Sequence, residues 1–409
     1  GGHLSGGIYF GRGDNIETKT TFKRFNSLGR FYGDFTEYLG FRRSNGEGKV
    51  MGLAPYGSHN EEVARVVSSY YSVADGQYDV EELTFRKPGD AVAKLERDLG
   101  LKKRYWRDDI EKHHKDVAFH VQRAVEDIVT KVVKHHLKQT SLSNVCLAGG
   151  VALNCKLNKH VRELSRVDGL FVQPAANDAG GSIGASCMLS VDRGDPIRQM
   201  DHTYFGSSFD DSDVIETVDE LKLNCERVDD APSRAAERVA EGELVGWFQG
   251  RMEGGPRALG NRSILADPRS ADSLDRVNEY VKHREAWRPF APSLLPEAAD
   301  RYLVGDISKA AHFMVDTYET TEAASEDIPA VLHPADQTTR PQVVLESTNP
   351  RYYQLIAAFE ERTDIGVVLN TSFNDSGEPM VRTPWEAIRD FYAMGLDALF
   401  IQDVLLEKP

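Results

Sequence analysis

Four arginines lie in one glycine-rich stretch, residues 247–269, and this stretch carries the most distinctive chemistry in the chain. The arginines are Arg251, Arg257, Arg262 and Arg269, and they are interspersed with Gly250, Gly254, Gly255 and Gly260. Glycine lets backbone N–H groups approach a ligand closely, and the planar guanidinium group matches two oxygens of a phosphate or a carboxylate. The stretch therefore predicts an anion-binding loop, with a basic surface turn as the alternative.

A second basic cluster, in residues 281–292, could serve the same anion. It contains Lys282, Arg284 and Arg288, and prolines in the segment favour extended backbone. Arg257 and Arg288 could hold opposite sides of one phosphate group. The alternative is a lattice of ion pairs with Glu253, Glu279 and Glu285, and this alternative is favoured for Lys282, Arg284 and Arg262.

Polar residues follow an apolar run near the C-terminal end of the sequence. Residues 366–369 predict a core strand that ends at Asn370, and Ser372 follows two residues later. Polar side chains at the end of a strand suit hydrogen bonding to a ligand amide and a phosphate. A turn in which Asn and Ser act as caps is the alternative.

Two further segments combine a short strand, paired glycines and a helix. Residues 144–147 lead into Gly149, Gly150 and Asn154, and residues 170–172 lead into Gly180 and Gly181. The N-terminus of a helix that follows such glycines attracts a phosphate, so these segments predict nucleotide binding. Asp178 precedes the second glycine pair, where it could cap the helix or bind a metal ion.

The apolar pattern predicts the elements that must position these residues. Apolar residues recur at three- and four-residue steps over 108–137, which indicates a long helix. Shorter helices are expected at 25–38, 214–223 and 231–241, strands at 245–248 and 398–401, and a helix with a capping box at 383–386. Together with the glycine-linked strands, this pattern predicts an α/β fold class.

Two tempting motifs are set aside. The GEGK sequence at 46–49 is not a Walker P-loop because Val50 stands where a Ser or Thr is needed, so a loop presenting Lys49 or a plain turn is expected. The histidine pairs at 113–114 and 135–136 lack a metal-ligand spacing, and solvated helix ends are the favoured interpretation.

Composition limits the possible functions. A chain of 409 residues suggests two or three domains, and a formal net charge of −15 argues against a general binder of nucleic acid or of membrane surfaces. The four cysteines show no disulfide framework, and there is no signal peptide and no apolar run near 18 residues. A reducing cytoplasm is therefore expected, and the opening residues suggest that the chain begins inside a domain.

Six segments, in order, give the chain a resemblance to a known family. They are GEGKVMGLAPYG, LAGGVALN, NDAGGSIGA, GRMEGGPRALGNRSILADPR, REAWRPFAPS and LNTSFNDSGEP. Together they resemble the O-carbamoyltransferases, which include nodulation protein U and antibiotic-tailoring carbamoyltransferases. The resemblance implies an actin/Hsp70-like ATPase-fold domain over 1–200. For 201–409 it implies a domain similar to threonylcarbamoyl-AMP synthase, which is α+β.

The same resemblance implies a reaction and its cofactors. Carbamoyl phosphate and ATP would form carbamoyl-adenylate in the second domain, and the carbamoyl group would pass to a hydroxyl of a small molecule or sugar in the first. ATP, Fe²⁺ and Mg²⁺ are the implied cofactors, and a homodimer is possible. By resemblance Arg257, Arg288, Asn370 and Ser372 contact carbamoyl phosphate, Lys282 and Arg340 are further candidate ligands, and Asp178 binds the metal.

One feature departs from the family pattern and leaves alternatives open. The family's metal-binding histidine pair has no counterpart before Gly46, so the chain is either a truncated product, which is favoured, or a degenerate relative. A partial protein that only binds nucleotide or carbamoyl phosphate is therefore one alternative function, and an ATPase-fold kinase is another. The sequence does not indicate the acceptor.

Overall fold

A computed structural model describes residues 3–282, 285 and 287–408, and the chain divides into two compact units after Ile197. Both units combine helices with strands, which confirms the predicted α/β class. Arg284 lies outside the described residues, so its predicted place in the basic cluster stays a prediction.

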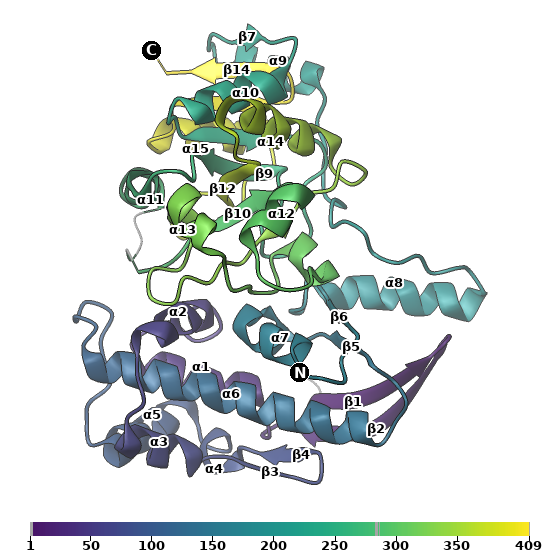
Figure 1. Cartoon of the computed structure of the whole chain (residues 1–409), viewed down its shortest axis with the longest axis vertical. Coiled ribbons are helices and arrows are strands. Elements are labelled where there is room, and N and C mark those ends of the chain that lie inside the picture. The colour runs from purple at the N-terminus through teal and green to yellow at the C-terminus, as the bar shows by residue number, and fades with distance from the viewer. Residues whose placement is uncertain (1–2, 283–284, 286, 409) are drawn as a thin grey trace. The chain divides into compact units, whose positions relative to one another are not determined.

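The first unit is built around one long helix, α6 (Lys112–Lys138), with shorter helices along it (Figure 1). These are α1 (Leu28–Tyr38), α2 (Glu47–Leu53), α3 (Glu61–Ser68) and α7 (Cys155–Arg162). Most of the apolar residues that predicted α6 are buried, so its apolar stripe forms the centre of this unit; they are Val117, Val121, Ala124, Val125, Ile128 and Val132. The helix begins at Lys112, four residues after the predicted start, because Glu111 caps it in a capping box with His114.

The remaining elements of the first unit are short. Its strands form the antiparallel pairs β1 (Leu4–Arg12) with β2 (Asn15–Lys23) and β3 (Ser72–Ala74) with β4 (Gln77–Asp79), and the parallel pair β5 (Asn144–Leu147) with β6 (Gly169–Val172). Its other helices are α4 (Glu81–Thr84), α5 (Pro88–Leu99), α8 (Gly180–Arg193) and the 3₁₀ turns at Ala54–Tyr56 and Gly150–Leu153.

Two expectations for the first unit are wrong. Lys49 lies within helix α2 rather than in a loop or turn. The histidine pairs are not simply solvated, because His113 Nε2 lies 2.9 Å from the Tyr38 hydroxyl and His136 Nε2 lies 3.0 Å from the Gly76 carbonyl oxygen. These histidines join α6 to neighbouring segments.

The second unit contains one eight-stranded mixed sheet, in the order β11-β10-β12-β9-β8-β13-β14-β7. Its strands are β7 (Glu226–Arg227), β8 (Val245–Phe248), β9 (Arg262–Ala266), β10 (Ala291–Leu294), β11 (Gln342–Val343), β12 (Val367–Ser372), β13 (Ala398–Ile401) and β14 (Val404–Glu407). The pairs β8–β13 and β10–β11 are parallel and the others are antiparallel. Every residue of β8 and β13 is buried, as expected for apolar runs in the middle of a covered sheet.

Helices flank this sheet (Figure 1). They are α9 (Asp211–Glu220), α10 (Ala231–Ala240), α11 (Ala271–Val277), α12 (Pro296–Tyr302), α13 (Glu322–Asp327), α14 (Pro350–Thr363) and α15 (Pro384–Ala393). Helix α10 packs against α14, and α15 packs against β8 and β13. The capping box predicted at 383–386 is confirmed, since the side chains of Thr383 and Glu386 each accept the expected backbone hydrogen bond.

Candidate functional site

The arginine-rich stretch forms the loop between β8 and β9, and a buried carboxylate organises it. Glu253 is only 3% exposed, and its Oε1 accepts hydrogen bonds from the backbone N–H groups of Leu259 (2.8 Å), Asn261 (2.7 Å) and Arg262 (3.1 Å). The loop does gather backbone donors around an anion, as the glycines suggested. That anion is the protein's own carboxylate, which the sequence did not indicate.

Arg262, Arg269 and Arg251 bind groups of the protein itself. Arg262 is fully buried and donates four hydrogen bonds to backbone carbonyl oxygens, and burial lowers its pKa to about 10. Arg269 forms an ion pair with Asp267 at 2.6 Å, and Arg251 donates a hydrogen bond to the carbonyl oxygen of Phe205. Arg257 is half-buried near the middle of the loop.

A buried row of polar side chains joins Asn370 to this loop. The Nδ2 group of Asn370 donates to the carbonyl oxygen of Ala258 (3.2 Å) and to Ser293 Oγ (2.9 Å). Ser293 Oγ in turn donates to Gln342, whose Nε2 donates to the carbonyl oxygen of Leu259 at 2.8 Å. Segments far apart in the sequence therefore meet beside Arg257, and Asn370 holds the loop directly.

A second polar arm holds the other side of the loop. The Tyr204 hydroxyl donates to the same Leu259 carbonyl oxygen at 2.8 Å, and Asn349 donates both to Tyr204 and to Asn261. Burial raises the pKa of Tyr204, so its hydroxyl keeps its proton at neutral pH. No local pattern pointed to Tyr204 or Asn349, because each lies far along the chain from the groups it binds.

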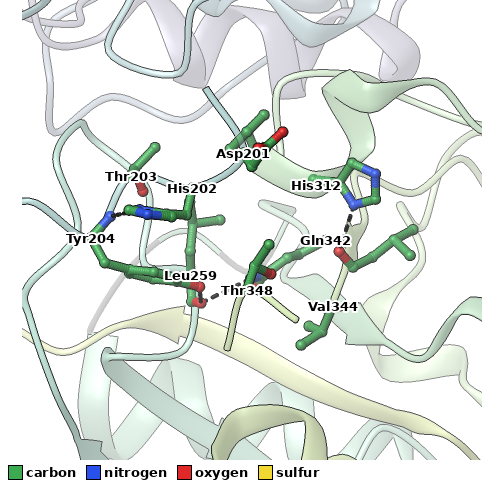
Figure 2. Close-up of a pocket in the computed structure, with 11 residues that line it drawn as sticks. Asp201, His202, Thr203, Tyr204, Leu259, His312, Gln342, Val344 and Thr348 are labelled. Atoms are coloured by element: carbon green, nitrogen blue, oxygen red, sulfur yellow. Dashed lines mark hydrogen bonds between the residues drawn. The ribbon is translucent and has the colours of Figure 1, made fainter. Parts of the chain in front are cut away.

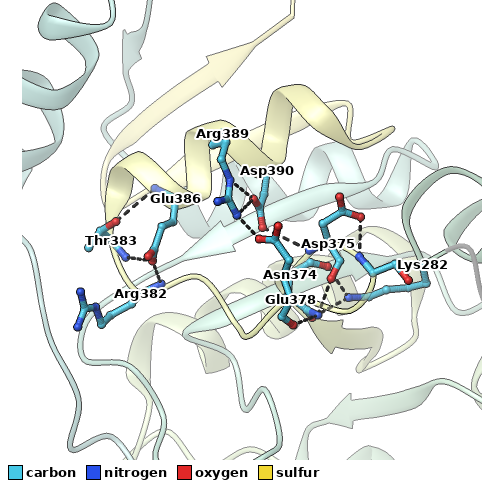
Figure 3. A network of polar contacts seen from close by, with 10 residues as sticks. Lys282, Asn374, Asp375, Glu378, Arg382, Thr383, Glu386, Arg389 and Asp390 are labelled. Atoms are coloured by element: carbon cyan, nitrogen blue, oxygen red, sulfur yellow. Dashed lines mark hydrogen bonds and ion pairs between the residues drawn. The ribbon is translucent and has the colours of Figure 1, made fainter. Parts of the chain in front are cut away.

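Lys282 and Ser372, both candidate ligands, are brought together at the end of β12, and Figure 3 shows Lys282 beside Asn374. The Nζ of Lys282 donates to the carbonyl oxygen of Ser372 (2.5 Å) and to both the carbonyl oxygen and Oδ1 of Asn374 (3.0 Å each). The lattice of carboxylates favoured for Lys282 is thus absent from these contacts, which are to neutral oxygens. A buried ammonium group therefore fixes the turn after β12.

The loop that follows this turn is tied to helix α15 (Figure 3). Arg389 forms ion pairs with Glu378 in the loop and with Asp390 on its own helix. Asp390 is 1% exposed and accepts a hydrogen bond from the backbone N–H of Asp375 at 3.3 Å. These contacts keep the turn that carries Ser372 in one conformation.

The two remaining candidate ligands of this unit are half-buried. The Nη1 of Arg288 lies 3.5 Å from Glu285 Oε2, which is one of the ion pairs that the alternative interpretation expected. Arg340 lies just before β11 and is also half-buried.

A small cavity lies beside the polar arms (Figure 2). Its lining includes His202, Tyr204, Leu259, His312 and Gln342. The Nδ1 of His202 accepts from the Tyr204 backbone N–H, and His312 Nδ1 lies 2.9 Å from the Val343 carbonyl oxygen. None of the predicted ligand residues lines this cavity, and no spacing in the sequence pointed to the two histidines.

The glycine pairs of the first unit differ from one another. Gly149 has a φ of +96°, and a Cβ atom at Gly149, at Gly150 or at Gly181 in the first turn of α8 would meet open space, so no other group among the described residues fills the space beside these three glycines. At Gly180 a Cβ would lie 2.3 Å from the Ala175 carbonyl oxygen, so that glycine permits a close backbone approach.

Asn154, a candidate nucleotide ligand, has structural partners. Its Oδ1 caps helix α7 through the Leu157 N–H (3.0 Å), and its amide pairs with that of Gln122 through two hydrogen bonds. A 3₁₀ turn separates Gly150 from α7, so the glycine pair does not lead directly into an α-helix.

Asp178 is exposed, and the capping role expected for it is wrong. The N-cap of α8 is Ala179, which makes no side-chain hydrogen bond. Within residues 3–282, 285 and 287–408, no three His, Cys, Asp or Glu side chains are grouped so that they could hold a metal ion. Asp178 therefore offers a single carboxylate, which is not a ligand set for iron or magnesium.

No helix among the described residues is both long enough and apolar enough to cross a membrane.

Comparison with known proteins identifies the family. Residues 2–187 match the model of the carbamoyltransferase N-terminus, and residues 236–408 match that of the carbamoyltransferase C-terminus. Nodulation protein NolO of Bradyrhizobium diazoefficiens is 40% identical over 100% of this chain and 74% of its own length. A 3'-hydroxymethylcephem-O-carbamoyltransferase of Amycolatopsis lactamdurans is 31% identical over 65% of this chain and 49% of its own length.

Among solved structures, full-length HypF in its phosphate- and nucleotide-bound form covers 45% of this chain with a TM-score of 0.30 and 17% identity, and 22% of HypF is matched. That score is too low to support an argument from HypF. The two family models and the extent of the likeness to NolO are sufficient: the chain belongs to the carbamoyltransferase family.

Proposed function

We propose that this protein is an ATP-dependent O-carbamoyltransferase, which binds carbamoyl phosphate in its second unit and delivers the carbamoyl group to the hydroxyl of a small molecule or sugar. Its family supports carbamoyl transfer, and the name of the Amycolatopsis relative specifies transfer to an oxygen. The chain spans only part of that relative, so ATP dependence and the acceptor class are parts of the proposal.

One observation carries the proposal. Asn370 is 2% exposed, its Nδ2 is used within the protein, and its Oδ1 is buried with no hydrogen-bond partner among the described residues. A buried acceptor without a donor is unfavourable by roughly 1–3 kcal/mol. The amino group of a carbamoyl ligand is a donor of the required kind, and it would bind beside the loop that carries Arg257.

The charges nearby suit the rest of the ligand. Carbamoyl phosphate carries a dianionic phosphate, and Arg257, Arg288 and Lys282 are the cations expected to bind it. Arginine stays protonated at neutral pH and can stabilise charge that develops on a departing phosphate. In this scheme Lys282 acts mainly through the turn that carries Ser372, since its Nζ already binds that turn.

The proposed reaction has three balanced steps. Water attacks the carbamoyl carbon, the C–O bond to phosphate breaks, and carbamate and inorganic phosphate form. A carbamate oxygen then attacks the α-phosphorus of ATP and displaces pyrophosphate. Finally the acceptor hydroxyl attacks the carbamoyl carbon, loses its proton to solvent, and releases AMP. Carbamate decomposes in bulk water, so the second step must follow the first before carbamate leaves the site.

The cofactors of the proposal are ATP, Mg²⁺ and Fe²⁺. The backbone at Gly149 and Gly150, and at Gly181 in the first turn of α8, leaves room for a nucleotide phosphate. The described residues do not fit a metal centre at Asp178, so no step is derived through iron or magnesium there.

Phosphate release tests the proposal directly. The full chain with ATP and carbamoyl phosphate, supplied with iron, should release phosphate and pyrophosphate, and Arg257→Ala should abolish both. Arg251→Ala is the matched control, because Arg251 lies in the same loop but is exposed and bonded to a backbone oxygen. Absence of both products with the unaltered protein would show the proposal to be wrong. Consumption of ATP without carbamoyl phosphate would favour a kinase or hydrolase.

A further inference from the structure

Glu253 is a buried carboxylate that neither the sequence motifs nor the proposed reaction uses as a ligand. One of its oxygens receives three backbone N–H groups, from Leu259, Asn261 and Arg262. Its second oxygen is buried with no hydrogen-bond partner among the described residues. Burial of this second oxygen is unfavourable, because it loses its hydration and gains no hydrogen bond in return. The three hydrogen bonds to the first oxygen must offset this cost.

The three N–H groups come from the part of the loop that returns to the sheet. Arg262 is the first residue of β9, whereas Arg257 lies five residues earlier in the chain. Glu253 stands on the outgoing side of the same loop, and its backbone forms an isolated bridge with Tyr204. The carboxylate therefore ties both sides of the loop together across the residues that include Arg257.

The charge of Glu253 is balanced by its surroundings. The negative charge of Glu253 acts on Arg262, where it raises a pKa that burial lowers, so the two buried ions stabilise each other. Arg262 itself holds backbone oxygens at both ends of the loop. The shape of the loop thus depends on two buried ions: Glu253 accepts hydrogen bonds from backbone N–H groups, and Arg262 donates hydrogen bonds to backbone carbonyl oxygens.

We infer that Glu253 is a positioning residue, whose carboxylate shapes the loop and thereby sets the place of Arg257. The effect of Glu253 on the shape of the loop does not depend on the proposed function, whereas its effect on the binding of carbamoyl phosphate rests on that function. In this role the length of the Glu253 side chain matters more than its negative charge, because the backbone N–H groups of residues 259, 261 and 262 require an oxygen at one position. Removal of one methylene should therefore be more harmful than removal of the charge.

Two variants separate reach from charge. Glu253→Asp keeps the charge but shortens the side chain, and Glu253→Gln keeps an oxygen at full reach but is neutral. Hydrogen–deuterium exchange of residues 259–262 should accelerate by at least about tenfold in Glu253→Asp. It should accelerate less in Glu253→Gln, which loses the charge interaction with Arg262 but keeps the oxygen that accepts the backbone hydrogen bonds. Strand β13 should be unchanged in both variants, which shows that the unit is still folded.

Kinetics supply the second measurement. In Glu253→Asp the KM for carbamoyl phosphate should rise by at least about tenfold with a smaller change in kcat, because a displaced Arg257 weakens ligand binding. Unchanged exchange in Glu253→Asp, or impairment of Glu253→Gln alone, would overturn the inference. Altered exchange with an unchanged KM would remove its kinetic part. If the unaltered protein releases no phosphate, the proposed function fails while the exchange experiment still decides the structural role.

Discussion

Replacing Arg262 with alanine should lower the free energy of unfolding of the second unit by about 5 kcal/mol. The guanidinium donates to the carbonyl oxygens of Gln249 (2.7 Å), Asn261 (2.8 Å), Ser207 (3.2 Å) and Gly250 (3.3 Å). Hydrogen bonds from a charged donor contribute about 1.5 kcal/mol each at the lower end of their range, and two of these are long, so the four contribute about 6 kcal/mol.

Two other terms modify that figure. Burial lowers the pKa of Arg262 to about 10, which corresponds to a cost of about 3 kcal/mol for keeping the charge inside. The guanidinium also lies 3.5 Å from the centre of the Phe248 ring, and a desolvated cation–π contact contributes about 2 kcal/mol. The expected net loss is therefore about 5 kcal/mol, a large effect for one substitution.

Urea unfolding followed by tryptophan fluorescence measures this loss. Trp247 is fully buried in β8 of the second unit, whereas Trp106 and Trp385 are 73% and 49% exposed, so the change in emission reports chiefly on the second unit. Arg234→Ala is the control, because Arg234 forms an exposed ion pair with Glu237 and its loss should change stability by less than about 1 kcal/mol. A loss below about 1 kcal/mol for Arg262→Ala would refute the account of the loop.

Two further substitutions probe backbone shape and buried charge. Gly260 has a φ of +98°, and a Cβ there would lie 2.1 Å from the Tyr352 ring, so Gly260→Ala should reduce the urea midpoint far more than Gly242→Ala, where φ is +88° but the space is open. Burial raises the pKa of the Asp34 carboxyl from 3.8 to about 6. Between pH 4 and pH 6 the folded protein therefore binds more protons at this group than the unfolded protein does, and the stability that Asp34 contributes to the folded protein is lost as the pH rises through that range. Thermal unfolding should show Asp34→Asn gaining about 3 kcal/mol relative to the original protein between pH 4 and pH 7, and parallel pH profiles would contradict this.

Local patterns were enough to predict the elements that carry the site. Strands β8 and β13 lie at their predicted residues because unbroken apolar runs can only be buried on both faces. The capping box before α15 was equally clear, because its two side chains bind backbone groups within the same turn. Such signals depend on residues only a few positions apart, so they can be recognised directly in the sequence.

The contacts that shape the site depend on separations that no local pattern reveals. Gln342 reaches Leu259 across 83 positions, and Asn349 reaches Tyr204 across 145. Glu253 lies close to its donors in sequence, but a glutamate beside arginines suggests ion pairs, and only the folded loop shows that it binds backbone N–H groups instead. Asn370 was predicted as a ligand, and its role in holding the loop was not foreseen.

The central position of β8 has a consequence for the order in which the protein matures. Its neighbours are β9, which follows shortly in the chain, and β13, which pairs with it from residue 398 onward. During synthesis, β8 and the loop after it therefore remain paired on one side only until residues 398–401 have left the ribosome. The hydrogen bond from Asn370 to the Ala258 carbonyl oxygen joins residues 112 positions apart, so it too can form only after a long segment of the chain has been made. The site is consequently completed only after β13 has been made, and a chain that stops before β13 would contain the arginines but would lack the strand that pairs with β8.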